Sequence, residues 1–94
     1  MKIKVFFEAQ LRQAAGTDST VVELDDAGSI QHAFSALAAS ASDDLANRLV
    51  DAAGLPQRSL LVFINDQPVS ADRFSDPILK ETDTLSILPP IAGG

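Results

Sequence analysis

The sequence of 94 residues contains no cysteine and a single histidine, His32. Without cysteine the chain cannot form disulfides, hold zinc or iron–sulfur clusters through thiolates, or use a thiol nucleophile. One histidine does not suffice for a histidine-rich metal site. We therefore expect no bound metal ion and no permanently bound cofactor.

Basic residues are also few, with seven Lys and Arg against thirteen Asp and Glu, for a formal charge of −6. Such a chain repels phosphate backbones, so we expect no nucleic-acid partner. No apolar run is long enough to cross a bilayer, and no signal-peptide pattern follows Met1, so we expect a cytoplasmic protein with no membrane partner. The acidic balance suits a protein partner with a basic face, or serves solubility alone.

The size and composition are those of one globular domain, with 46% hydrophobic residues and only five Gly and five Pro. A chain of this length has room for a single core. Alternation of apolar and polar residues predicts strands, and apolar residues at helical spacing predict helices. We expect strands at 2–7, 19–24, 58–64, 67–69 and 84–88, a short helix at 9–15, a main helix from Ser29 to Ala41, and a second, shorter helix that opens at Ser40 and Asp43 and runs to Ala53.

The third strand contains five consecutive apolar residues, Leu60 to Ile64, which predict a central strand buried on both faces. Asn65-Asp66 predicts a tight hairpin, and Pro68 predicts an edge strand because proline cannot donate to a ladder. Residues 71–83 then form a packed loop anchored by hydrophobic side chains, Phe74, Ile78 and Leu79. The order predicts an α+β fold, with a mixed five-stranded sheet packed on one main helix.

Residues that could support catalysis are scattered. His32 lies on the main helix without a spaced partner, so a surface or structural role is the simpler interpretation. The pairs Asp25-Asp26 and Asp43-Asp44 precede helices, where carboxylates are favourable. The sequence has no glycine-rich phosphate loop and no defensible Ser–His–Asp arrangement. We therefore do not expect an enzyme.

The C-terminal segment is unusual, because two adjacent glycines at given positions have only about a 0.5% chance of occurring. A frayed end or an expression remnant would also explain Gly93-Gly94, but the preceding Leu88-Pro89-Pro90-Ile91 is stiff and then apolar, whereas frayed ends are usually polar. Pro89-Pro90 prevents continuation of the last strand. We expect a domain over residues 1–88 and an extended, flexible tail over residues 89–94.

Several segments together resemble one family, the ThiS/MoaD family of ubiquitin-like sulfur carriers. They are Lys2-Ile-Lys-Val-Phe-Phe7, Ala9-Gln-Leu-Arg12, Gly16, Phe63-Ile-Asn-Asp66, Asp83 and Leu88-Pro-Pro-Ile-Ala-Gly-Gly94. The resemblance extends over the whole chain, and the tail is its most specific part. It implies the β-grasp fold, which agrees with the predicted order of elements.

The resemblance also implies a chemistry for the tail. In this family the carboxylate of the last glycine, here Gly94, is adenylated by an E1-like enzyme with ATP and converted by a sulfide or persulfide to a thiocarboxylate. The thiocarboxylate then donates sulfur to a sulfur-accepting synthase in cofactor biosynthesis. The small subunit of molybdopterin synthase is the simplest assignment. Carriers for cysteine, thiamine or another metabolite, a ubiquitin-like protein modifier, and a β-grasp binding module with an inert tail remain alternatives.

Two groups of site residues follow from the resemblance. The tail residues Pro90, Ile91, Ala92 and Gly93 would enter the activating enzyme, where glycines fit a narrow channel because they lack Cβ atoms. The partner interface would comprise residues beside the tail, Phe7, Glu8, Arg12, Leu88 and Pro89. Phe7 is equally well explained as a core residue.

Overall fold

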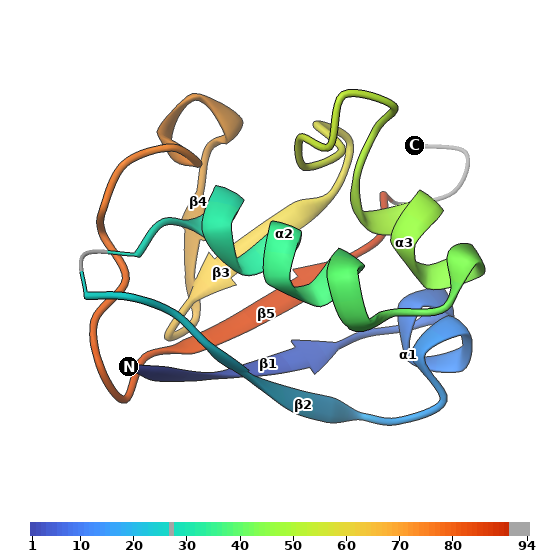
Figure 1. The fold of residues 1–94 in the computed structure, drawn as a ribbon, viewed down its shortest axis with the longest axis horizontal. Helices are drawn as coiled ribbons and strands as arrows, with labels where there is room; N and C mark the ends of the chain where they lie inside the picture. Colours follow the sequence, from blue (N-terminus) through green and yellow to red (C-terminus); the bar gives the residue numbers. More distant parts are fainter. Residues whose placement is uncertain (27, 91–94) are drawn as a thin grey trace.

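The computed structural model describes residues 1–26 and 28–90, which form one sheet and four helical segments (Figure 1). The expectations for Ile91, Ala92, Gly93 and Gly94, and for the flexibility of the tail, lie outside the described residues. In chain order the elements are β1 Lys2–Phe7, α1 Gln10–Ala15, β2 Ser19–Glu23, α2 Ile30–Ser40, α3 Asp43–Leu49, β3 Leu61–Ile64, β4 Gln67–Val69, a 3₁₀ helix Ala71–Arg73, and β5 Thr84–Leu88.

The sheet has the strand order β2-β1-β5-β3-β4. The central strands β1 and β5 are parallel, whereas β1–β2, β3–β5 and β3–β4 are antiparallel. Figure 1 shows α2 lying across one face of this sheet, with α1 and α3 at one end. This arrangement is the β-grasp, ubiquitin-like fold, so the predicted α+β class and the mixed five-stranded sheet are confirmed.

The core lies between the sheet and α2 and follows the strand periodicity. Ile3, Val5 and Phe7 of β1 point inward, as do Leu85 and Ile87 of β5, and each is at most 2% exposed. Four residues of α2 complete this layer at helical spacing, Ile30, Ala33, Phe34 and Leu37. The intervening strand residues therefore face the opposite, outer side of the sheet.

The main helix begins where the sequence predicts. The Ser29 hydroxyl accepts a hydrogen bond from the His32 backbone N–H at 3.1 Å, and the His32 side chain accepts one from the Ser29 N–H at 3.4 Å. His32 therefore has a capping role. Asp25 and Asp26 precede this helix but do not lie in its first turn.

The second helix differs from the prediction at both ends. Its N-cap is Ser42, whose hydroxyl accepts from the Leu45 N–H at 3.3 Å, and not Ser40, which donates back to carbonyls of α2. It ends at Leu49 rather than Ala53, because an Asp51 carboxylate oxygen accepts from the N–H groups of Ala53 and Leu55 and closes a turn.

The prediction for the third strand is wrong in position and burial. β3 begins at Leu61 and lies second from the edge, and β5 occupies the centre. Leu61 is 43% exposed, because only one face of the sheet is covered by helices. The hairpin is confirmed, since Asn65 and Asp66 have φ values of 49° and 70°, and β4 with Pro68 is an edge strand.

The loop from Ala71 to Asp83 is anchored by two of the three predicted residues, and Ile78 is only half-buried and does not belong to the core. Phe74 and Leu79 are 5% and 2% exposed, and the Phe74 ring stacks on Phe34 with centroids 6.4 Å apart. No helix within residues 1–26 or 28–90 is long and apolar enough to span a membrane.

Candidate functional site

The end of β5 places the first tail residues at one end of the sheet. β5 stops at Leu88, and the two prolines that follow continue the chain outside the ladder. On one side the Glu8 N–H donates to the Ile87 carbonyl at 3.1 Å, and on the other Leu61 pairs with Leu88. The base of the tail therefore lies between the end of β1 and the start of β3.

Glu8 and Arg12 are joined beside this base. Arg12 Nη2 lies 2.9 Å from Glu8 Oε1, and Arg12 Nε donates to the Phe7 carbonyl at 3.3 Å and lies 3.5 Å from Asp18 Oδ1. The Glu8 and Arg12 side chains are 36% and 51% exposed. Both charges are thus held in place at the surface and are open to a partner.

Of the five residues expected at the partner interface, Phe7 does not reach the surface. It is 2% exposed and pairs with Ile87 on the inner face of the sheet, so it belongs to the core. Leu88 and Pro89 are half-buried and Pro90 is exposed. The described part of the expected site therefore consists of Glu8, Arg12 and these three residues.

The outer face of the sheet adds apolar residues that the sequence reasoning missed. Strand register aligns Phe6, Ser86 and Phe63 across three neighbouring strands, and Leu61 beside Leu88. Because their chain neighbours point into the core, these side chains point outward. The sequence gives only a weak signal for this arrangement, because all residues from Leu60 to Ile64 are apolar and the run therefore also fits burial on both faces.

A shallow hollow of about 290 Å³ runs over this outer face. Glu8, Phe63, Asp66, Ser86 and Leu88 line it. Ser86 has the smallest side chain of the five, and Glu8 and Asp66 contribute two carboxylates to the lining. The surface beside the tail is therefore apolar with acidic margins, which suits contact with a protein that carries basic residues.

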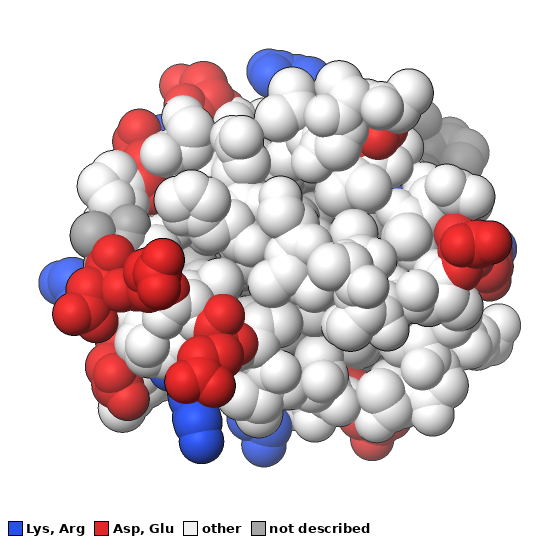
Figure 2. All heavy atoms as spheres, viewed as in Figure 1, with Lys and Arg blue, Asp and Glu red and all other residues white. Residues whose placement is uncertain are grey.

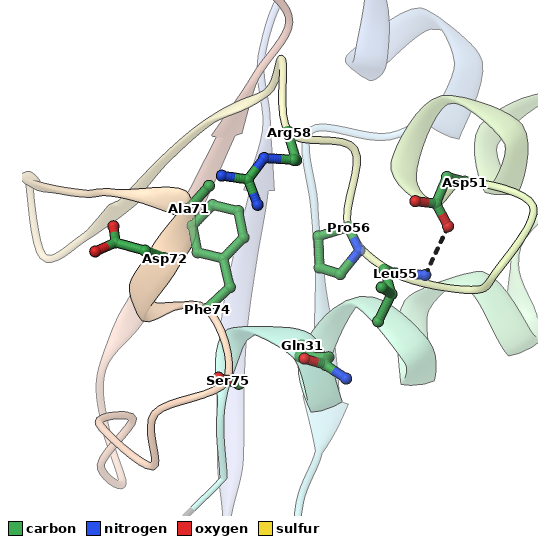
Figure 3. Close-up of a pocket in the computed structure, with 9 residues that line it drawn as sticks. All are labelled: Gln31, Asp51, Leu55, Pro56, Arg58, Ala71, Asp72, Phe74 and Ser75. Carbon is green, nitrogen blue, oxygen red and sulfur yellow. Dashed lines mark hydrogen bonds between the residues drawn. The ribbon is translucent and has the colours of Figure 1, made fainter.

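A different pocket, of about 280 Å³, lies between α2, the loop before β3 and the 3₁₀ helix (Figure 3). Arg58 and Phe74 point into it, and an Asp51 oxygen at its side accepts from the Leu55 N–H at 3.0 Å. The Ser70 hydroxyl, and to a lesser degree Arg58 and Arg73, lower the pKa of the nearby Asp72 carboxyl. The lining includes no nucleophile paired with a base, so the pocket does not indicate catalysis.

Acidic residues do not gather into a metal site in the described part of the chain. Within residues 1–26 and 28–90, no group of three or more His, Asp and Glu side chains could hold a metal ion. Asp43 and Asp44 lie in the first turn of α3, as predicted, where their negative charges interact favourably with the helix dipole. Asp83 instead binds the hairpin, accepting from Asn65 Nδ2 at 2.7 Å and from the Lys80 N–H at 2.8 Å.

Comparison with known proteins gives one family match, to the model of the ThiS family, over residues 5–94. No curated protein sequence matches the chain significantly. Among solved structures, the HVO 2177 protein of Haloferax volcanii superposes with a TM-score of 0.82 at 29% identity, covering 100% of this chain and 87% of that one.

Two further structures are similar at lower identity. The small archaeal modifier protein 1 of Methanosarcina acetivorans has a TM-score of 0.82 at 23% identity, covering 99% of this chain and 96% of that one. A chain of the BexX/CysO complex of Amycolatopsis orientalis has a TM-score of 0.73 at 22% identity, covering 98% and 99%. At these identities the similarity establishes the fold.

Proposed function

Because the chain belongs to the ThiS family, the ubiquitin-like sulfur carriers that its sequence resembles, we propose that Gly94 carries sulfur as a C-terminal thiocarboxylate. The observation that carries this proposal is the family match, which runs through the tail to Gly94. The described structure supports it, since β5 leads the chain out of the sheet beside an exposed, partly apolar surface.

Two covalent steps make up the proposed chemistry. First, a Gly94 carboxylate oxygen attacks the α-phosphorus of ATP on an E1-like enzyme, and pyrophosphate leaves. Next, sulfide attacks the carbonyl carbon of the acyl-adenylate, and AMP leaves with the electrons of the broken C–O bond. Activation is needed because a free carboxylate has no good leaving group. The chain acts as a carrier in this scheme, and the partner enzymes supply the catalytic groups.

The residues before Gly94 would position the carboxylate. Pro89 and Pro90 have fixed φ angles, which reduces the entropy lost when the tail enters an active site. Gly93 lacks a Cβ atom and leaves room for a close approach. We assign the adjoining interface to Glu8, Arg12, Leu88 and Pro89, without Phe7, which is buried.

The acceptor that we propose first is the precursor of molybdopterin, with this chain as the small subunit of the synthase. Carriers that supply sulfur for cysteine, thiamine or another metabolite use the same terminus. CysO of Amycolatopsis orientalis was solved in complex with BexX, so one protein of similar fold forms a complex with a partner. Sulfur transfer from the purified thiocarboxylate to each acceptor in turn identifies the pathway.

Protein modification is the second candidate function. It is favoured by the similarity to small archaeal modifier protein 1 at a TM-score of 0.82. In this case a lysine amine, rather than sulfide, attacks the activated carbonyl carbon and forms an isopeptide bond. The same adenylate serves both outcomes.

Intact mass spectrometry separates the two functions. The chain is incubated with an E1-like enzyme, ATP and sulfide, and then with a cell extract. Replacement of one oxygen by sulfur indicates a carrier, adducts on lysines of other proteins indicate a modifier, and an unchanged mass contradicts both.

Deletion of Gly94 tests the role of the terminus. The shortened chain still ends in a carboxylate, on Gly93. Because the chain is one residue shorter, the attacking carboxylate oxygen lies about 3.3 Å further from the α-phosphorus of ATP, whereas reaction requires the two atoms to come within about 3–3.5 Å. We expect ATP–pyrophosphate exchange to be lost and thermal stability to stay unchanged. An added residue after Gly94 should also prevent exchange. Full exchange by the deletion variant would rule out the assignment.

A further inference from the structure

The edge strand β2 is open to a further strand on the side away from β1. β2 faces β1 through alternate residues: Leu24 and Met1 exchange N–H to carbonyl bonds at 2.8 and 2.6 Å, and the Asp18 carbonyl accepts from the Phe7 N–H at 2.9 Å. By this alternation, the backbone groups of Val21 and Glu23 point away from β1.

The two edges of the sheet differ in how they are protected. At the other edge, β4 is three residues long and contains Pro68, which has no N–H to offer. β2 is five residues long, Ser19-Thr-Val-Val-Glu23, and within it no proline or lysine interrupts the edge. Val21 at its centre is 57% exposed. β2 is therefore the edge that can accept a partner strand.

Two hollows border β2 on the side of α2. The first, of about 240 Å³, has an apolar floor of Phe7, Leu37 and Leu45 and opens beside Thr20. The second, of about 440 Å³, lies at the far end of β2, between Glu23 and the His32 and Ser35 side chains of α2. Alternate side chains of an added strand would point toward these hollows.

The charges around this groove are uneven. The second hollow is lined by Glu23, Asp25 and Asp26, and Figure 2 shows acidic side chains gathered over the end of β2 and the loop that follows it. The helix α2 has no charged residue along its length, and the centre of the face in Figure 2 is uncharged. On the side of α2, the groove therefore changes from neutral and apolar at Thr20 to acidic at Glu23, about 10 Å further along the strand. Lys2 and Lys4 of β1 are the cross-strand neighbours of Glu23 and Val21, so Asp25 and Asp26 are the acidic residues of the hollow without a basic cross-strand neighbour in β1.

We propose that β2 binds an extended peptide segment of a partner protein as a sixth strand of the sheet. The segment has apolar, β-branched residues at its centre, one of which enters the hollow above Phe7 and Leu37, and a Lys or Arg at the end that lies beside Glu23, Asp25 and Asp26. Main-chain hydrogen bonds to Val21 and Glu23 supply the pairing. A second copy of this chain is the less suitable occupant, because both copies carry a net charge of −6 and the β2 segment of the second copy contains no Lys or Arg to lie beside the acidic residues.

This binding site is independent of the Gly94 chemistry, so it is tested without an activating enzyme. The probe is the synthetic peptide Lys-Lys-Val-Thr-Val-Thr-Val-Lys-Lys, titrated into the full chain and followed by amide chemical shifts and hydrogen exchange. We expect shifts at residues 19–23 and along α2, and slower exchange of the Val21 and Glu23 amides. A peptide with Glu in place of Lys should bind about tenfold more weakly, and one with proline as the central residue should not bind.

Matched variants locate the two determinants. The double substitution Asp25→Asn with Asp26→Asn should weaken binding of the Lys peptide about fivefold. Asp66→Asn with Asp72→Asn makes the same change in net charge near the opposite edge of the sheet and should leave the affinity within about twofold. Val21→Pro removes an N–H that points away from β1, so it should abolish binding while the β1 amides keep their shifts.

Three outcomes would overturn the proposal. They are the absence of any shift at millimolar peptide, shifts confined to β4 or to the outer face of the sheet, and equal binding of the Lys and Glu peptides. Slow exchange of Val21 and Glu23 that grows with protein concentration in the free chain would instead show that a second copy occupies β2.

Discussion

At the scale of the residue, the Glu8–Arg12 pair combines a fixed position with exposure to solvent. The two residues are four positions apart, and the Arg12 guanidinium is also held by the Phe7 carbonyl and lies near Asp18. Exposed ion pairs of this kind contribute little to stability, since water screens both charges. The position of Glu8 beside Leu88 therefore matters more for contact with a partner than for folding.

Substitution of Glu8 should separate these two roles. We expect Glu8→Phe to change the free energy of unfolding by less than about 1 kcal/mol, because the carboxylate is partly exposed and leaves no buried charge behind. Glu8→Phe and Glu8→Lys should both alter affinity for the cognate partner. Urea unfolding and binding titrations measure the two effects.

A matched control is available in α3. Arg48 Nε lies 3.1 Å from Asp44 Oδ1 in an exposed pair of the same spacing, away from the base of the tail. Asp44→Asn should leave both stability and partner binding nearly unchanged. If neither Glu8 variant affects partner binding, this end of the sheet is not the interface.

At the scale of the element, the helices α2 and α3 both begin with a serine N-cap, but the two caps differ in their burial and in how much of the core the helix contributes. Ser29 is 2% exposed and opens α2, which contributes Ile30, Phe34 and Leu37 to the core. Ser42 is exposed and opens the seven-residue helix α3. The backbone N–H freed by loss of a cap can reach water at Ser42 but is less accessible at Ser29.

Removal of the caps should therefore have unequal costs. We expect Ser29→Ala to lower the free energy of unfolding by about 1–2 kcal/mol and Ser42→Ala by about 0.5–1 kcal/mol. Chemical denaturation followed by far-UV circular dichroism measures both. A larger loss for Ser42→Ala would contradict the reasoning from burial.

The β3–β4 hairpin is joined to β5 through Asn65. Its side-chain oxygen accepts from the Thr84 N–H at 2.9 Å, its amide donates to Asp83 at 2.7 Å, and its own φ is 49°. Asn65 thus meets two requirements at once, a left-handed backbone and a connection across strands. Two substitutions distinguish these requirements.

Asn65→Gly keeps the left-handed backbone and removes the side-chain bonds, so it should cost about 1 kcal/mol. Asn65→Ala loses both and should cost about 1–2 kcal/mol more, because a Cβ atom is unfavourable at positive φ. The difference between the variants in urea unfolding is the measurement. Equal costs would mean that the backbone conformation at this position relaxes in the alanine variant.

At the scale of the whole molecule, one continuous core joins the sheet to all three α-helices. It includes Leu11 of α1, Phe34 of α2, Leu49 of α3 and Ile87 of β5, each at most 1% exposed. A small domain with a single core usually unfolds in one cooperative transition. Loss of packing in one helix should therefore destabilise the entire sheet.

Leu49→Ala tests this cooperativity. We expect it to lower the free energy of unfolding by about 2–5 kcal/mol, since it leaves a cavity in the core. Leu55→Ala is the matched control; Leu55 is 45% exposed, and the cost should stay below about 1 kcal/mol. Amide signals of α3 and of β5 should disappear at the same urea concentration. Separate midpoints would show that α3 unfolds independently.

The residues of the candidate site follow from the family resemblance, but two of their properties depend on local sequence and elementary chemistry alone. Pro89-Pro90 ends a strand whatever surrounds it, and a carboxylate such as that of Glu8 favours the surface because a lone buried charge is costly. The burial of Phe7 and the exposure of Leu61 could not be predicted in this way. Both are apolar and both lie in strands, and their sequence neighbourhoods do not reveal which face of the sheet is covered.

The order of strands and helices, the Ser29 cap and the Asn65-Asp66 turn could be predicted from the amino-acid sequence, since backbone conformation there depends on residues close in the chain. The central position of β5, the burial of Phe7, the exposure of Leu61 and the free edge of β2 emerge only from the folded arrangement of the strands. These properties depend on which strands pair and which face α2 covers. Such contacts join residues far apart in the chain, and local periodicity does not encode them.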